Sequence, residues 1–265
     1  MTTTPVSTHA RAAPLAGARL ALVMGSGGVR SIAAPGMWEV LAAEGIAPDL
    51  IVGYSAGAIF GALIAAGHKA TDAVRMAGFD ADFALRDDRP VVQHLEQAFG
   101  DVRLEDLRVP LPVTTTDAAT GDSVVLSQGS LVDALRAAVA LPFMFAAVKI
   151  DGRRLIDGFV SNPVPVSVAA DAHNVLALGF ASPMPHRIDR PTRLLAQFTS
   201  AMTNNLVEAR LAAATAGGQR LITLMPTLDR RVGLFDSDAM PYLVEAGRRA
   251  TQARLPAILA LLAAA

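Results

Sequence analysis

A serine flanked by glycines gives this sequence its strongest chemical signal. The segment Gly53-Tyr54-Ser55-Ala56-Gly57 fits the pattern G-x-S-x-G and joins a predicted strand to a predicted helix, as that motif requires. On such a turn the backbone is strained and the serine Oγ is pushed outward, while the two glycines leave room for the strand and the helix. A serine hydroxyl becomes a useful nucleophile only when a base lies within hydrogen-bond reach.

A second glycine-rich segment follows the first predicted strand and reads Gly25-Ser26-Gly27-Gly28-Val29-Arg30. Consecutive glycines allow backbone N–H groups to point together at an anion. In acyl transfer this anion is the oxyanion of the tetrahedral intermediate. A nucleotide-binding G-x-G-x-x-G loop is the alternative, but Arg30 occupies its third glycine position and the second strand ends in the serine turn, not in a ribose-binding acid.

Asp157 is the first candidate for the base. It follows the strand-like segment 154–156 and precedes Gly158, so a tight turn would hold its carboxylate. A carboxylate can accept a serine proton when a low-dielectric site raises its basicity. An ordinary Asp-Gly turn is the plain alternative for this segment.

A histidine is the second candidate, as part of a Ser-Asp-His triad. His173 and His186 both follow the serine at positions that suit the chain order of an α/β-hydrolase. His173 lies at the start of a predicted strand, which is the wrong end of a parallel sheet for the active edge. His186 follows that strand in a proline-rich loop and is better placed, so this alternative stays open.

Strands and helices alternate along the chain, which favours a three-layer α/β/α fold with a mainly parallel central sheet. The carboxyl ends of parallel strands share one edge, so the serine turn and the glycine loop should lie side by side there. We expect residues 1–17 to form a disordered leader and residues 18–265 a single domain. The predicted strands are 20–24, 50–54, 111–116, 123–126, 148–150, 154–156, 175–180 and 221–225, and the predicted helices are 35–44, 56–66, 131–140, 192–215 and 238–263.

The composition narrows the classes of function. The 265-residue chain is 52% hydrophobic and 18% charged, so it has enough apolar residues for a large core. Its formal net charge of -1 gives no electrostatic case for binding nucleic acid. The absence of cysteine excludes a disulfide, a zinc-thiolate site and a cysteine nucleophile. No metal cluster or cofactor motif is evident, so we expect metal-independent hydrolysis.

Every long apolar run is interrupted by charged residues, so no transmembrane helix is predicted. We therefore expect a cytoplasmic protein that makes at most transient contact with a membrane surface, and the sequence indicates no oligomeric state. Arg248, Arg249 and Arg254 precede an apolar C-terminal run. This arrangement would suit an interfacial helix, but a helix packed against the rest of the chain is the favoured interpretation.

Taken together, the three motifs resemble those of the patatin-like phospholipase family, especially short bacterial members related to neuropathy target esterase. The family carries a G-G-G-x-R/K-G loop, a G-x-S-x-G serine and an Asp-Gly-Gly/Ala motif, which correspond here to residues 26–31, 53–57 and 157–159. The segments 128–137 and 160–166 are similar to further stretches of the family. The likeness covers residues 18–250.

This resemblance implies a patatin-like fold and a Ser55–Asp157 dyad without a catalytic histidine. Ser55 would attack the ester of an acyl lipid such as a phospholipid, lysophospholipid or glyceride. Asp157 would take the serine proton and later activate the water that cleaves the acyl-enzyme. The residues implied to bind the oxyanion through backbone N–H groups are Gly27, Gly28 and Val29, and the supporting motif positions are Gly25, Arg30, Gly53, Gly57 and Gly158.

Several positions depart from the family's pattern or can be interpreted in two ways. Ser26 and Ser31 replace glycines of the loop, although Ser31 could instead cap the next helix. Phe159 stands where a small residue is usual, and Phe143 replaces a common glycine. Arg30 would either contact a phosphate or tie the loop to the sheet. A catalytically weakened lipid-binding or regulatory protein of the same fold is therefore a further hypothesis, beside the dyad and the triad.

Overall fold

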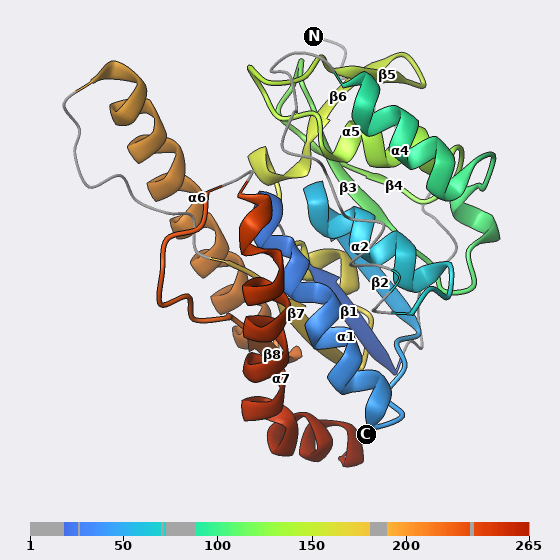
Figure 1. Ribbon diagram of the computed structural model, residues 1–265, viewed down its shortest axis with the longest axis vertical. Coiled ribbons are helices and arrows are strands. Elements are labelled where there is room, and N and C mark those ends of the chain that lie inside the picture. The colour runs from blue at the N-terminus through green and yellow to red at the C-terminus, as the bar shows by residue number, and fades with distance from the viewer. Residues whose placement is uncertain are drawn as a thin grey trace, which may run out of the picture.

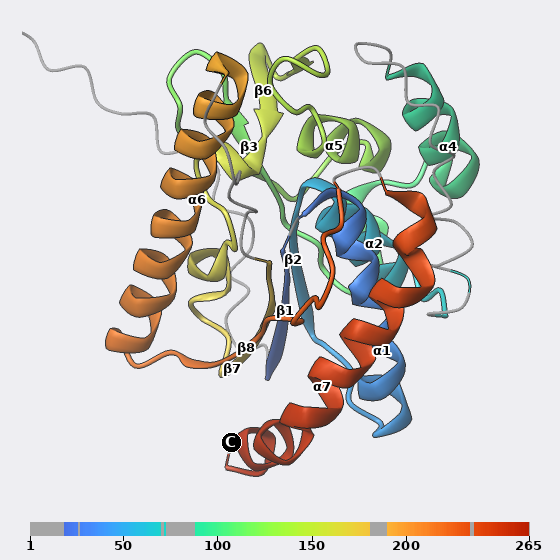
Figure 2. The ribbon, with the colours of Figure 1, turned by 60° about the vertical axis from the view of Figure 1, so that its left-hand side comes forward.

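The protein is described by a computed structural model that covers residues 19–25, 27–69, 72, 88–180, 190–233 and 236–264. Its centre is an eight-stranded sheet with the order β5-β6-β3-β2-β1-β7-β8, and β4 pairs with β3. Helices cover both faces of this sheet (Figures 1 and 2). The predicted α/β fold with a central sheet between helices is confirmed.

The strands are β1 (Leu20–Met24), β2 (Leu50–Tyr54), β3 (Val113–Asp117), β4 (Ser123–Leu126), β5 (Val148–Ile150), β6 (Arg153–Asp157), β7 (Asn174–Leu178) and β8 (Arg220–Leu224). The α-helices are α1 (Ala33–Ala43), α2 (Ser55–Ala65), α4 (Arg89–Phe99), α5 (Leu131–Ala138), α6 (Pro191–Ala216) and α7 (Met240–Ala263). The short 3₁₀ helices are η1 (Gly28–Ile32), η2 (Leu104–Asp106), η3 (Gly158–Val160), η4 (Val166–Ala169) and η5 (Ser237–Ala239).

The middle of the sheet is parallel and its β5–β6 edge is antiparallel. Strands β3, β2, β1, β7 and β8 all run in one direction. Strand β6 pairs antiparallel with β3, and β5 pairs antiparallel with β6. The carboxyl ends of β1, β2 and β7 therefore share one edge, β3 begins at the level where β2 ends, and β6 reaches the same region from the opposite direction.

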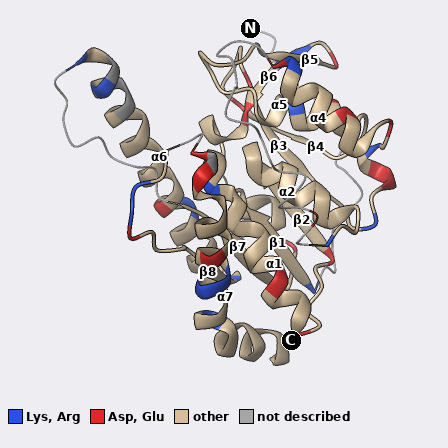
Figure 3. Cartoon of the chain, in the orientation of Figure 1, with Lys and Arg blue, Asp and Glu red and all other residues tan. Residues whose placement is uncertain are grey.

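The central strands are apolar because both of their faces are covered. Strands β1, β2 and β7 are buried along their whole length and carry no charged residue, as expected for parallel strands between two helical layers (Figure 3). One core cluster joins the sheet to α1, α2 and α7. The other joins it to η4 and to Val207 of α6.

Helices α1 and α7 cross with almost no space between their backbones. A Cβ atom added at Gly36 would lie 1.9 Å from the Val244 carbonyl oxygen, and one added at Gly247 would lie 2.0 Å from the Ala33 carbonyl oxygen. Only glycine can occupy these two positions, since any side chain would push the helices apart. Helix α7 is thus a packing helix along its middle, and its Arg248 forms ion pairs with Glu39 and Glu245.

The predicted elements agree with the structure apart from their ends. The strand predicted over 175–180 is β7 and stops at Leu178, while the helix predicted over 35–44 begins earlier, at Ala33. The expected leader at 1–17 lies outside the described residues. Across the part of the chain that is described, no helix combines the length and the apolar character needed to cross a membrane.

Candidate active site

Ser55 sits on a strained turn at the end of β2. It is the first residue of α2, its φ angle is +50°, and it is 5% exposed. A positive φ is unfavourable for a residue with a side chain, and it marks a position that the surrounding structure holds in place. The turn therefore has the geometry that the motif predicts, with a serine side chain projecting at the strand-to-helix junction.

The glycines on either side of Ser55 are required by close backbone contacts. A Cβ at Gly53 would lie 2.6 Å from Cα of Ala58, in the first turn of α2. A Cβ at Gly57 would lie 2.3 Å from the Met24 carbonyl oxygen at the end of β1. The first glycine lets α2 fold back on β2, and the second brings the serine turn against the neighbouring strand.

Replacing Gly57 by alanine should lower the free energy of unfolding by about 2 kcal/mol or more, because the new methyl group would meet fixed backbone of β1. Urea denaturation measures this change. The matched control is Gly233→Ala, where the nearest atom to the added Cβ is 3.9 Å away, and it should change stability by less than about 0.5 kcal/mol. Equal effects of the two substitutions would contradict this account of the motif.

The glycine loop lies beside the serine turn, at the carboxyl end of β1. Gly25 is held against β7, because its N–H donates to the Leu178 carbonyl at 2.7 Å and an added Cβ would lie 2.2 Å from the same oxygen. Gly28 has a φ angle of +61° and begins η1. The first N–H groups of a helix have no acceptor within it, so the backbone of Gly28 and Val29 offers donors at this edge.

The loop serines do not behave alike. Ser31 is fully buried and its Oγ donates to the Gly25 carbonyl at 3.5 Å, so it closes the loop on itself. The residue that precedes α1 is Ile32, and no side chain caps this helix. The interpretation of Ser31 as a helix cap is therefore wrong. Ser26 lies outside the described residues.

Arg30 points back into the protein. It is 7% exposed, its Nε donates to the Gly27 carbonyl at 3.1 Å, and its guanidinium lies 5.7 Å from the centre of the Phe180 ring. Burial lowers the pKa of this guanidinium below its usual value. Of the two roles considered for Arg30, this geometry favours the one that ties the glycine loop to the sheet.

The pairing of strands β2, β3 and β6 brings Asp157 close to Ser55. In the sheet, Tyr54 of β2 pairs with Thr114 of β3, and the next residue of β3, Thr115, pairs with Asp157 of β6. The turn after Asp157 is pressed against the same strands, since a Cβ at Gly158 would lie 2.3 Å from the Thr114 carbonyl oxygen and 3.2 Å from Cβ of Tyr54. The third motif is thus adjacent to the residue that precedes the serine.

The carboxyl group of Asp157 is fully buried, and burial raises its pKa from an ordinary value of 3.8 to about 7. The Ser55 hydroxyl and the Phe159 N–H oppose part of this shift. Oδ1 accepts from the Phe159 N–H at 3.0 Å, whereas Oδ2 has no partner at hydrogen-bond distance. The serine contact is therefore looser than a formed hydrogen bond, as is common in active sites before substrate binds.

A series of polar contacts that the sequence analysis did not predict holds the turn after Asp157 in place. The Thr116 Oγ1 donates to the Asp157 carbonyl at 3.0 Å and lies 2.8 Å from the Ser161 Oγ. The guanidinium of Arg210, on α6, donates to the Ser161 carbonyl at 2.8 Å. In the sequence, only the three consecutive threonines at 114–116 could have indicated these polar contacts, because fully buried threonines need hydrogen-bond partners.

The structure bears on only one of the two candidate histidines. His173 precedes β7, so it lies at the amino edge of the parallel strands, opposite the serine turn. This placement removes it from the candidate site. His186 lies outside the described residues, and the Ser-Asp-His alternative therefore depends on it alone.

The two unusual phenylalanines lie on segments that border Asp157. The N–H of Phe159 binds the Asp157 carboxylate, so this residue keeps the turn closed. Phe143 has a φ angle of +70° and is 87% exposed, which explains why glycine would suit this position. The N–H of Asp157 donates to the Ala140 carbonyl at 3.0 Å, which ties the Phe143 segment to the site.

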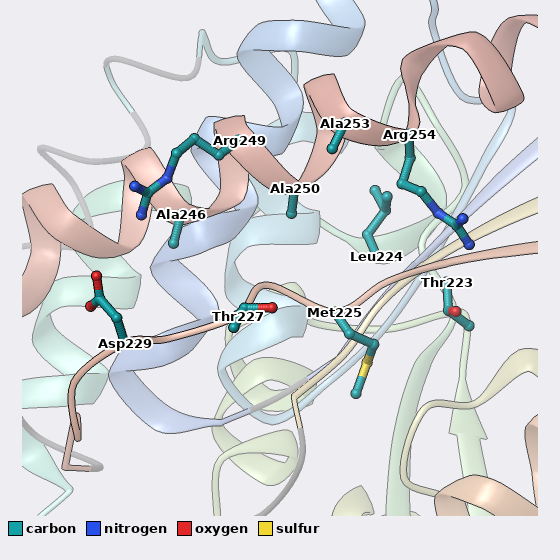
Figure 4. Close-up of a pocket in the computed structure, with 10 residues that line it drawn as sticks. All are labelled: Thr223, Leu224, Met225, Thr227, Asp229, Ala246, Arg249, Ala250, Ala253 and Arg254. Carbon is teal, nitrogen blue, oxygen red and sulfur yellow. The ribbon is translucent and has the colours of Figure 1, made fainter.

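A separate groove lies between α7 and the segment at the end of β8 (Figure 4). Its volume is about 580 Å³, and its floor includes Ala246, Ala250 and Ala253, with Arg249 and Arg254 on its borders. Neither Ser55 nor Asp157 lines it. Among the described residues, no group of three or more acidic or histidine side chains is placed to hold a metal ion.

Comparison with known proteins identifies relatives of the chain. The family model described as patatin-like phospholipase matches residues 22–170. An uncharacterized NTE family protein of Mycobacterium tuberculosis is 29% identical over 296 residues, covering 96% of this chain and 50% of the relative. The neuropathy target esterase sws of Drosophila melanogaster is 28% identical over 188 residues, covering 63% of this chain and 13% of that protein.

The chain therefore spans about half the length of the mycobacterial relative, and much less of the Drosophila protein. Among solved structures, VipD from Legionella pneumophila superposes with a TM-score of 0.55 at 12% sequence identity. This match covers 92% of this chain and 66% of VipD. At this identity the likeness bears on the fold alone.

Proposed function

Because the chain belongs to the patatin-like phospholipase family, we propose that it is a serine hydrolase that cleaves acyl esters of lipids. The observation that carries the proposal is a buried carboxyl group with a pKa of about 7 beside a serine on a strained strand-to-helix turn. A carboxyl group whose pKa lies near the working pH is suited to take up a proton and return it. The substrate class is a phospholipid, a lysophospholipid or a glyceride.

In the first half of the proposed reaction, Asp157 accepts the proton of the Ser55 hydroxyl as Oγ attacks the ester carbonyl carbon. The negative charge that forms on the carbonyl oxygen is bound by backbone N–H groups of Gly27, Gly28 and Val29. The start of α2, at Ser55, adds a favourable helix dipole. When the intermediate collapses, Asp157 gives the proton to the leaving alcohol, and the acyl group remains on Ser55.

In the second half, a water molecule gives a proton to Asp157 and attacks the acyl-enzyme. The same N–H groups bind the second oxyanion, and collapse releases the carboxylic acid while Ser55 recovers its proton from Asp157. Burial favours this cycle because it penalises the charged carboxylate and so makes it a stronger base. The raised pKa of Asp157 supports this assignment.

A fluorophosphonate probe tests the nucleophile directly. We expect it to label the wild-type chain once, at Ser55, as located by mass spectrometry of the labelled peptide. The labelled chain should lose its hydrolysis of p-nitrophenyl butyrate, and the unlabelled chain should also hydrolyse members of a lipid panel. A folded wild-type chain that neither reacts with the probe nor hydrolyses any ester would contradict the proposal.

A substitution of His186 separates the dyad from the triad. His186→Ala should keep the turnover of p-nitrophenyl butyrate within about threefold of the wild type, since a dyad does not use this imidazole. A loss of about 10³-fold or more would instead identify a Ser-Asp-His enzyme. His173→Ala is the matched control, because it removes a histidine at the opposite edge of the sheet.

A further inference from the structure

Helix α6 is much longer than the strands that it connects. Its 26 residues correspond to about 39 Å, whereas β7 and β8 have five residues each, or about 17 Å. The helix follows β7, so it starts at the carboxyl edge of the sheet and returns to the amino edge before β8. Its extra length therefore projects beyond one edge of the sheet.

The C-terminal half of α6 is the anchored half. Val207 belongs to the core on this face of the sheet, and Leu211 and Ala214 pack against that core. Arg210 holds the Ser161 carbonyl beside the Asp157 turn. The N-terminal half is therefore the part that projects past the carboxyl edge, where the candidate site lies, and Figure 1 shows it extending from the body of the molecule.

The projecting half carries a row of exposed apolar side chains. Leu194, Phe198 and Met202 are 43%, 60% and 70% exposed, and they follow each other at intervals of four residues. Side chains with this spacing lie on one face of a helix, and none of the three belongs to a core cluster. We call this row the α6 apolar stripe. A contiguous row of large exposed apolar side chains marks an interaction site.

The charged residues at the start of α6 are both arginines. Arg190 and Arg193 lie at the start of the helix, and the chain has no acidic residue between Arg190 and Glu208 (Figure 3). A helical segment with an apolar face, two cationic residues and no acid over residues 190–207 has the character of helices that lie in the surface of an anionic bilayer.

Further exposed apolar side chains lie on the segments that hold Asp157. Val160 is 42% exposed in η3, which begins directly after Asp157. Phe143 is 87% exposed on the segment that accepts the Asp157 N–H through Ala140. Phe143 also keeps a strained φ angle that glycine would relieve. The candidate site is thus accompanied by further exposed apolar side chains.

We propose that the α6 apolar stripe, with Arg190 and Arg193, docks the protein on the surface of an anionic phospholipid bilayer. The inference rests on the proposed lipid hydrolysis, because it names the surface from which the Ser55 site would take its substrate. The apolar side chains enter the boundary between headgroups and acyl chains, and the guanidinium groups face the lipid phosphates. This places the carboxyl edge of the sheet toward the bilayer.

Flotation of the full chain with phospholipid vesicles tests this surface. The Ser55→Ala variant is used as the parent, so that hydrolysis does not consume the vesicles. We expect it to float with vesicles of phosphatidylcholine and phosphatidylglycerol, to bind pure phosphatidylcholine less well, and to detach as salt rises from about 0.1 to 0.5 M. Adding Phe198→Ser and Met202→Ser should lower the partition coefficient by about tenfold or more.

The matched control is Leu259→Ser, which removes an apolar side chain that is 43% exposed on α7, outside the stripe. It should bind vesicles as the parent does. A second variant, Arg190→Ser with Arg193→Ser, should reduce binding to anionic vesicles and leave the residual binding to neutral vesicles unchanged. Equal flotation of the parent and the Phe198/Met202 variant would overturn the proposal.

Two further measurements keep this proposal distinct from the proposed function. With Ser55 present, the Phe198/Met202 variant should hydrolyse soluble p-nitrophenyl butyrate like the wild type while losing most of its turnover on vesicle lipid. If the parent binds vesicles but the wild type hydrolyses no ester, the function fails and the docking surface stands. If sedimentation shows that the substitutions only convert a dimer to a monomer, without an effect on flotation, the occupant is a second copy of the chain and the proposal is wrong.

Discussion

Replacing Ser55 by alanine should reduce the turnover of p-nitrophenyl butyrate by about 10⁴-fold or more, because the proposed nucleophile is lost while the rest of the site is kept. The expected effect is large since Ser55 is the hydroxyl group that the Asp157 carboxyl group contacts, and since its strained turn presents it at the carboxyl edge of the sheet. Steady-state kinetics on purified protein measure the loss. Binding of a substrate analogue should remain within about threefold.

Ser130→Ala is the control for this substitution. Ser130 caps α5 by accepting the Asp133 N–H at 3.2 Å, so its loss should cost about 1 kcal/mol of stability and leave turnover unchanged. If the Ser55→Ala protein retained more than about a tenth of the wild-type turnover, another nucleophile would be at work. A residual rate far below this limit is expected from the binding of substrate alone.

Replacing Asp157 by asparagine should remove activity and raise stability at the same time. The loss of turnover should be about 10³-fold or more, since asparagine cannot accept a proton. The pH profile of kcat/KM in the wild type should rise through about 7 and then level off, because only the ionised Asp157 is a base. A wild-type profile that is flat between pH 5 and 9 would contradict this role.

The sign of the stability effect follows from the raised pKa. In the native state Asp157 holds its proton up to about pH 7, whereas an unfolded chain releases it near pH 3.8. The stabilisation from the neutral buried group is complete below pH 3.8 and is lost as pH rises through about 7. The shift corresponds to about 4 kcal/mol, so Asp157→Asn should unfold later than the wild type at pH 8, with a gain that shrinks toward pH 4.

Urea denaturation at pH 5 and pH 8 measures this difference, with Asp117→Asn as the control. Asp117 is a buried carboxylate of the adjacent strand β3, and its Oδ1 accepts the Ala119 N–H at 2.9 Å. Its replacement should not increase stability at either pH, because the asparagine Oδ1 can still accept the Ala119 N–H but without the charge that strengthens a hydrogen bond to a carboxylate. If Asp117→Asn raised stability as much as Asp157→Asn does, the gain could not be attributed to the buried carboxyl group of Asp157.

Much of the fold could be predicted because the local signals agree with each other. Strands β1 and β2 have the continuous apolar runs of parallel strands, and close backbone contacts require a glycine beside the end of each, Gly25 after β1 and Gly53 within β2. The serine turn was predicted from the same glycines. These features depend on residues that are near each other in the chain, so a single sequence contains them.

The approach of Asp157 to Ser55 could not be derived from spacing alone. It depends on β6 running antiparallel beside β3, with Thr115 opposite Asp157, and an Asp-Gly turn by itself gives no such register. The resemblance to the family supplied this pairing where the pattern did not. The role of Arg210 beneath the turn was missed for a related reason, since its bond to the Ser161 carbonyl joins segments 49 positions apart.

The direct contact between α1 and α7 has a consequence for protein synthesis. The glycine loop is linked to α1 and rests on β7, and α7 packs against both η1 and α1 through the Gly36 and Gly247 contacts. Translation completes the serine turn, at the start of α2, long before it reaches α7, which begins at Met240. The glycine loop should therefore gain its full support only after α7 has been translated, so a nascent chain that lacks α7 should not yet hold this loop in place.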